Sequence, residues 1–100
     1  MDTRRRMSKK ADIPATGTRW YVYIIQASDE SLYTGITTDV ERRFNEHANP
    51  LKGARFFRGR RPVEVVYIES HPDRSSALRR ESAIKNLPRK LKLELIGRGC

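Results

Sequence analysis

The stretch WYVYIIQASDESLYTG, from Trp20 to Gly35, decides the fold of this chain. It contains two runs of aromatic and β-branched residues, which favour β-strands. The residues SDES between them are typical of a turn. Because two strands joined by a tight turn pair antiparallel, we expect a hairpin here. Three of the four tyrosines of the chain lie in this stretch, and Tyr23 and Tyr33 lie at the centres of the two strands.

The register of the hairpin decides whether these two tyrosines meet. Side chains alternate faces along a strand, and directly opposed residues of an antiparallel pair point to the same side. Tyr23 and Tyr33 therefore share a face only if the numbers of opposed residues sum to an even value. A pairing of Gln26 with Leu32 satisfies this condition and leaves a short loop. Both phenols would then lie beside Gly35, although this pattern alone favours ordinary packing of two strand tyrosines.

The segment after the hairpin predicts a short helix and a long loop. Asp39 is a typical helix N-cap and precedes VERRFNEH, residues 40–47. Residues 48–62 are basic and contain glycine, so we expect a loop with a turn of helix around Arg55 and Phe56.

A third strand and two helices are expected in the rest of the chain. VEVVYIE, residues 63–69, is typical of a strand, and a helix should run from Asp73 or Ser75 to Leu87. The final segment, RKLKLELI, alternates like a strand, but we favour a helix because Pro88 can occupy its first turn. The order β-β-α-β-α-α predicts an α+β fold in which helices pack on a small three-stranded antiparallel sheet.

The charge of the chain indicates a polyanionic partner. Its 100 residues include 21 Lys and Arg against 12 Asp and Glu, a net charge of +9. Such a field suits nucleic acid, while the alternative is a charged surface that only maintains solubility. We expect no membrane association, because the sequence has no long apolar segment and no lipidation signal. A single cysteine and no signal-peptide pattern predict a cytoplasmic protein.

Three parts of unequal size are expected along the chain. Residues 1–18 are polar and basic, and we interpret them as a flexible arm or, equally well, as an extension without a role. Residues 19–97 would form a single domain, and residues 98–100 a short tail.

Three polar residues fall on the apolar faces of the expected helices. Arg43 and His47 lie on or beside the apolar stripe of the first helix, where a phosphate could pair with the arginine. The alternative is an arginine that extends along the sheet edge and a satisfied core histidine. Glu81 lies in the middle of the apolar face of the second helix, where a carboxylate is costly unless it is paired. An ion pair with Arg43 and a divalent-metal site explain Glu81 equally well.

Together these positions resemble the GIY-YIG nuclease family. The two halves of the family motif are VYI, Val22 to Ile24, and YTG, Tyr33 to Gly35, and the Arg, His and Glu above follow in the family's order. The resemblance extends from Trp20 to Ile96 and is greatest to the small stand-alone YhbQ-like branch.

The sequence departs from the family pattern at two motif positions. Val22 replaces the first glycine and Thr34 replaces the middle isoleucine, and neither change removes a catalytic side chain. Asn86 is a possible match for the family's late asparagine.

The resemblance implies hydrolysis of phosphodiesters with one Mg²⁺ or Mn²⁺ ion. Glu81 would hold the metal, and Arg43 would grip the scissile phosphate. Tyr23 would act as the general base with His47 assisting it, while Tyr33 orients water or phosphate; the reverse assignment of the tyrosines stays open.

We therefore expect a DNA endonuclease that selects structure rather than sequence, with a role in DNA repair and a possible protein partner for targeting. The alternatives are a nucleic-acid-binding module without turnover and a protein-interaction domain. Phe56 and Phe57 would either stack on bases or pack in the core. The nucleic-acid backbone would be contacted by basic residues of the long loop: Lys52, Arg55, Arg58, Arg60 and Arg61.

Overall fold

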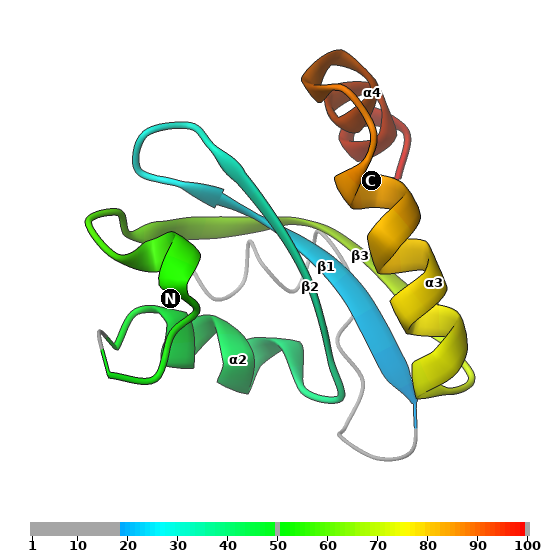
Figure 1. Cartoon of the computed structure of the whole chain (residues 1–100), viewed down its shortest axis with the longest axis horizontal. Helices are drawn as coiled ribbons and strands as arrows, with labels where there is room; N and C mark the ends of the chain where they lie inside the picture. The colour runs from blue at the N-terminus through cyan, green and yellow to red at the C-terminus, as the bar shows by residue number, and fades with distance from the viewer. Residues whose placement is uncertain (1–18, 50, 100) are drawn as a thin grey trace.

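The computed structural model describes residues 19–49 and 51–99 of the chain. Its elements follow the expected order β-β-α-β-α-α, which confirms the predicted α+β fold (Figure 1). They are β1 (Trp20–Ala27), β2 (Leu32–Thr37), α2 (Val40–His47), a 3₁₀ turn (Arg55–Phe57), β3 (Pro62–His71), α3 (Arg74–Lys85) and α4 (Arg89–Gly99).

The three strands form one antiparallel sheet in the order β2-β1-β3. In the hairpin, Gln26 pairs with Leu32 and Tyr23 pairs with Gly35, so the numbers of opposed residues sum to the same even value. This is the expected register, and it places Tyr23 and Tyr33 on one face of the sheet.

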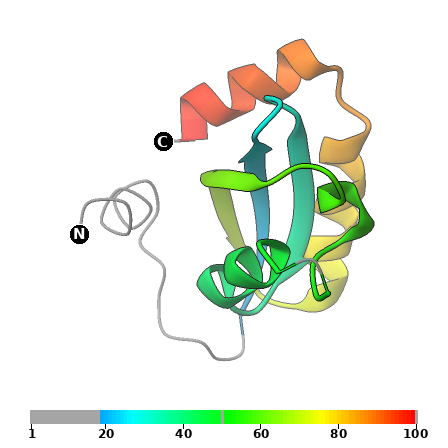
Figure 2. The ribbon, with the colours of Figure 1, turned by 90° about the vertical axis from the view of Figure 1, so that its left-hand side faces the viewer.

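Alternation along the central strand β1 divides the core into two layers. Tyr21, Tyr23 and Ile25 pack on one face with Val40 of α2 and with the 3₁₀ turn, while Val22 and Ile24 face α3. Each fully buried aliphatic side chain contributes about 1.5–3 kcal/mol through loss of exposed apolar surface. The sheet consequently lies between α2 on one side and α3 on the other (Figures 1 and 2).

Side-chain caps fix where the two core-covering helices begin. Asp39 accepts a hydrogen bond from the backbone N–H of Arg42, and Asp73 accepts one from Ser76. Both caps satisfy a backbone donor that the first turn of a helix leaves unpaired. Helix α2 therefore has the predicted bounds, and α3 begins within the predicted range.

Several boundaries differ from the sequence-based expectation. Strand β3 is longer, because it pairs with β1 from Trp20 opposite His71 to Ala27 opposite Pro62. Helix α3 ends at Lys85, two residues before the expected end at Leu87.

The last segment, RKLKLELI, is helical, so its strand alternative is wrong. Helix α4 follows Pro88 and continues to Gly99, past the expected start of the tail. The basic arm expected at residues 1–18, and the last residue of the tail, lie outside the described residues. No helix in the described part of the chain has the length and apolar character needed to cross a membrane.

Candidate active site

The hydroxyl of Tyr23 lies at the centre of the candidate site. Its side chain is 1% exposed on the α2 side of the sheet, and its Oη lies 2.9 Å from Nε2 of His47. Across the hairpin, Tyr23 packs on the bare backbone of Gly35: a Cβ there would lie 2.5 Å from Tyr23 Oη. Gly35 thus gives the phenol the space that any other residue would fill.

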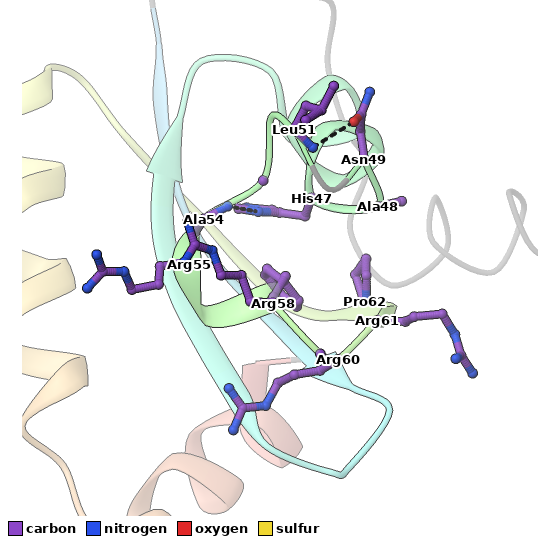
Figure 3. A pocket seen from close by; sticks show the side chains of 13 residues that line it. His47, Ala48, Asn49, Leu51, Ala54, Arg55, Arg58, Arg60, Arg61 and Pro62 are labelled. Atoms are coloured by element: carbon purple, nitrogen blue, oxygen red, sulfur yellow. Dashed lines mark hydrogen bonds between the residues drawn. The ribbon is translucent and has the colours of Figure 1, made fainter.

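A backbone contact determines which nitrogen of His47 carries its proton. The N–H of Ala54 donates to Nδ1 of His47 at 3.3 Å (Figure 3), so Nδ1 must keep its lone pair. A neutral imidazole accepts at one nitrogen and donates at the other, so Nε2–H donates to Tyr23 Oη. Burial, together with the nearby charge of Arg43, lowers the pKa of His47 to about 4. At neutral pH His47 is consequently an uncharged hydrogen-bond donor.

The environment of Tyr23 favours the protonated phenol. Burial raises its pKa well above the usual range, and electrostatic interaction with the neighbouring Tyr33 and with Glu81 raises it further. The positive charge of Arg43 acts in the opposite direction. Three of the other predicted site residues, Tyr33, Arg43 and Glu81, therefore influence the pKa of Tyr23. More positive charge is needed before Tyr23 can act as a base near neutral pH.

The second tyrosine belongs to an aromatic cluster around His47. The ring of Tyr33 lies 6.2 Å from Tyr23 and 5.0 Å from His47, measured between ring centroids. Phe57 is buried and lies 4.6 Å from His47, so it belongs to the core rather than to a base-stacking surface. Phe56 contacts Tyr33, and the guanidinium of Arg60 lies over the Phe56 ring, 4.3 Å from its centroid.

Arg43 lies at the edge of the site with part of its side chain exposed. Its Nη1 donates to Glu46 Oε1 at 2.9 Å and to the carbonyl of Lys52 at 3.2 Å. Sequence reasoning missed this partner, although the i,i+3 spacing on one helix is a recognisable signal for such a pair. The ion pair holds the guanidinium beside Tyr23 while leaving donors available to a phosphate.

Glu81 is largely shielded, with 18% of its side chain exposed, and its partner is Lys85 Nζ at 3.3 Å. The expected alternative, an ion pair between Glu81 and Arg43, is therefore wrong: each residue pairs within its own helix. Lys85 is half-exposed, and such surface pairs typically contribute about 0–1 kcal/mol, so a cation can displace it.

Glu81 supplies a single carboxylate of the kind that a Mg²⁺-type cation binds. Among the described residues no group of three or more His, Cys, Asp or Glu side chains is arranged to hold a metal ion. A site here would thus rest on one carboxylate, which suits Mg²⁺ because this ion retains several waters and often binds substrate phosphates.

The structure does not bring Asn86 to this site. It is exposed at the C-cap of α3, five residues after Glu81, which corresponds to roughly 140° around a helix.

The basic loop divides into exposed residues and one that is held in place. Arg60 donates to Asp29 at 2.9 Å and to the carbonyl of Phe56 at 2.8 Å, so it ties the loop to the hairpin. The exposed basic residues of this loop are Lys52, Arg55, Arg58 and Arg61.

Fold and site together define a GIY-YIG-type nuclease domain. The GIY-YIG catalytic domain matches residues 19–94, and the chain belongs to this family. It is 44% identical over 83 residues to the UPF0213 protein YhbQ of Escherichia coli K12, a match that covers 83% of this chain and 82% of that protein. It is 57% identical to UPF0213 protein DP2720 of Desulfotalea psychrophila over 68% of this chain, and the match spans 62% of that relative.

A solved structure supports the same assignment. The solution NMR structure of the UPF0213 protein BH0048 from Bacillus halodurans is 43% identical, with a TM-score of 0.51, over 79% of this chain and 83% of that one. Membership in a family defined by a catalytic domain points to endonuclease activity and nucleic-acid binding in general.

Proposed function

We propose that this protein is a divalent-metal-dependent endonuclease that hydrolyses phosphodiester bonds of DNA and selects structure rather than sequence. The observation that carries the proposal is the buried hydrogen bond between Tyr23 and the neutral His47, next to Arg43 and within the electrostatic reach of Glu81. A binding module without turnover would gain nothing from a shielded carboxylate on α3 or from a phenol held in a buried hydrogen bond to a neutral histidine.

The residues of the chain divide the work between binding and proton transfer. Arg43 binds the scissile phosphate through its remaining guanidinium donors. Tyr23 first gives up its own proton to solvent, and the Nε2–H of His47 stabilises the resulting phenolate. This phenolate then accepts a proton from the attacking water and returns to the neutral phenol. Tyr33, which contacts both rings, positions the water or the phosphate. We assign the base to Tyr23 because it holds the bond to His47.

Glu81 would hold Mg²⁺ or Mn²⁺ against the phosphate. When bound, the cation supplies positive charge that offsets the charge developing on the phosphate, favours the phenolate and helps the 3′ oxygen to depart.

The exposed basic residues support selection by structure. Lys52, Arg55, Arg58 and Arg61 suit contacts to phosphates, which position a nucleic acid without reading its sequence.

A cleavage panel tests the proposal. Purified protein is incubated with Mg²⁺ or Mn²⁺ and duplex, single-stranded or branched DNA, or with RNA, beside Glu81→Ala and Arg43→Ala variants. We expect DNA cleavage that both substitutions abolish. Equal cleavage by the variants would show that a contaminating nuclease is responsible. Binding without cleavage in any metal would instead establish the non-catalytic module.

A further inference from the structure

A pocket of about 500 Å³ lies beside the candidate site and shares His47 with it. It is lined by the loop that follows α2 and by the residues that lead from the 3₁₀ turn into β3 (Figure 3). Its volume is within the range of about 300–1,000 Å³ that is typical of small-ligand sites. His47, which bonds to Tyr23 and lines the pocket, joins the two places.

Uncompensated positive charge surrounds this pocket. Arg55, Arg58 and Arg61 line it, and none of their side chains forms an ion pair with a carboxylate of residues 19–49 or 51–99. Arg60 also lines it but is neutralised by Asp29. Figure 3 shows Arg61 extending to the opposite side of the pocket from Arg55 and Arg60. Anionic groups can therefore be bound along its rim.

The remaining wall contains several apolar side chains beside the polar His47 and Asn49. Ala54, Phe57 and Pro62 contribute to the lining, and Leu51 lies at the mouth of the pocket with 92% of its surface exposed. A single exposed leucine is common, but this one is placed where a ligand in the pocket would cover it. Apolar side chains next to unpaired arginines match a nucleotide, whose flat base is largely apolar on its faces and whose phosphate is anionic.

We infer that this pocket receives one unpaired nucleotide of the DNA strand, next to the phosphate held at Arg43 and Tyr23. The inference rests on the proposed function, since it names the part of a DNA substrate that the same face binds. A base in a duplex must first leave the stack, which costs several-fold to many-fold in affinity, whereas a single-stranded base enters without that cost. The pocket therefore selects frayed, tailed or branched DNA over blunt duplex.

Binding of tailed duplexes that differ only in their bases tests this inference. One fluorescent duplex carries a single-stranded thymidine tail, and the other carries a tail of abasic residues with the same number of phosphates. Anisotropy titrations in EDTA exclude cleavage, so the result does not depend on catalysis. We expect the wild-type protein to bind the thymidine tail about tenfold more tightly, because only this tail has a base to place in the pocket.

Substitutions distinguish binding of a base in the pocket from general electrostatic attraction between the protein and DNA. Leu51→Gln should bring the ratio of the two affinities close to one, whereas Leu91→Gln, at an exposed leucine of α4, should leave it unchanged. Arg58→Ala should weaken binding of both tails by more than Arg89→Ala, a control in α4. Equal binding of both tails by wild type, or a ratio unaffected by Leu51→Gln, would overturn the inference. If the protein cleaves DNA in the panel but binds both tails equally, only the pocket assignment is refuted. If it prefers the thymidine tail but does not cleave DNA, only the catalytic proposal is refuted.

Discussion

The Nε2–H of His47 donates a hydrogen bond to Tyr23 Oη at 2.9 Å, and the backbone N–H of Ala54 fixes this direction by occupying Nδ1. The Tyr23 hydroxyl therefore accepts this hydrogen bond and keeps its own proton for another acceptor. In the proposed reaction His47 does not take up a proton; it stabilises the negative oxygen of Tyr23. This arrangement leads to predictions that a base role for His47 would not make.

Replacement of His47 by glutamine should impair cleavage less than replacement by alanine. The Gln side-chain amide can donate to Tyr23 Oη, whereas Ala cannot. Since a hydrogen bond to a charged group contributes about 1.5–3 kcal/mol, His47→Ala should reduce kcat by about 10- to 100-fold. Single-turnover cleavage rates of both variants measure the difference. Equally low rates would indicate that His47 transfers a proton itself.

The buried neutral state of His47 also predicts a loss of stability in acid. Its pKa is about 4 in the folded protein against 6.5 as the ordinary value. Between these pH values the unfolded chain binds more protons, so the free energy of unfolding is highest above pH 6.5 and falls as the pH approaches 4, by up to about 3 kcal/mol. Urea unfolding at several pH values measures this decrease. The decrease should be smaller in His47→Gln, and an identical pH profile for that variant would refute the assignment.

Gly35→Ala should disrupt the site from the opposite strand. The added Cβ would lie 2.5 Å from Tyr23 Oη and 2.8 Å from its Cζ, which forces the buried ring to move. Overpacking of this kind costs about 1–3 kcal/mol. Urea denaturation should show this loss, together with a fall in cleavage.

A glycine with open surroundings provides the matched control. A Cβ at Gly97 in α4 meets no atom within 4 Å, so Gly97→Ala should leave stability unchanged or raise it, because alanine favours a helix. Comparable losses in the two variants would show that the contact with Tyr23 is unimportant.

Much of this fold was predictable because its determinants are local or periodic. The alternation of side chains along β1 and β2 was sufficient to predict the hairpin register, and Asp39 marked the start of α2. The pairing of Glu81 with Lys85 could also have been predicted, since i,i+4 neighbours meet on a helix.

The contacts that define the chemistry of the site were harder to predict from the sequence. The bond from Ala54 to His47 depends on the path of the loop between them, and periodicity carries no information about that path. The tie between Arg60 and Asp29 joins residues that are distant in the sequence, so a run of basic residues could not show which of its members is already paired.

A polar network on the other side of the sheet should affect stability without affecting cleavage. Glu69 accepts hydrogen bonds from Tyr67 Oη at 2.5 Å and from Arg80 Nε at 2.8 Å, and it contacts His71 Nε2 at 2.8 Å. Burial raises the pKa of Glu69, but these hydrogen bonds hold it below the ordinary value. Glu69→Gln should lower the free energy of unfolding by about 1–3 kcal/mol, because the network loses its charged acceptor.

The same change at Glu41, an exposed residue of α2, provides the control for that prediction. Thermal and urea unfolding should separate the two variants, while both should cleave DNA at the wild-type rate. A strong loss of cleavage in Glu69→Gln would place part of the chemistry in this second network.

The central claim, that Tyr23 is the base of a hydrolytic site, is tested most directly by comparing Tyr23→Phe with Tyr21→Phe. Both substitutions remove one hydroxyl from buried tyrosines on the same strand and the same face of the sheet. Single-turnover cleavage of DNA in saturating Mg²⁺ is measured for each. We predict that Tyr23→Phe reduces the rate by about 10²- to 10⁴-fold, as expected for loss of a general base, while Tyr21→Phe stays close to wild type. Cleavage by Tyr23→Phe at the rate of Tyr21→Phe would contradict the proposed mechanism.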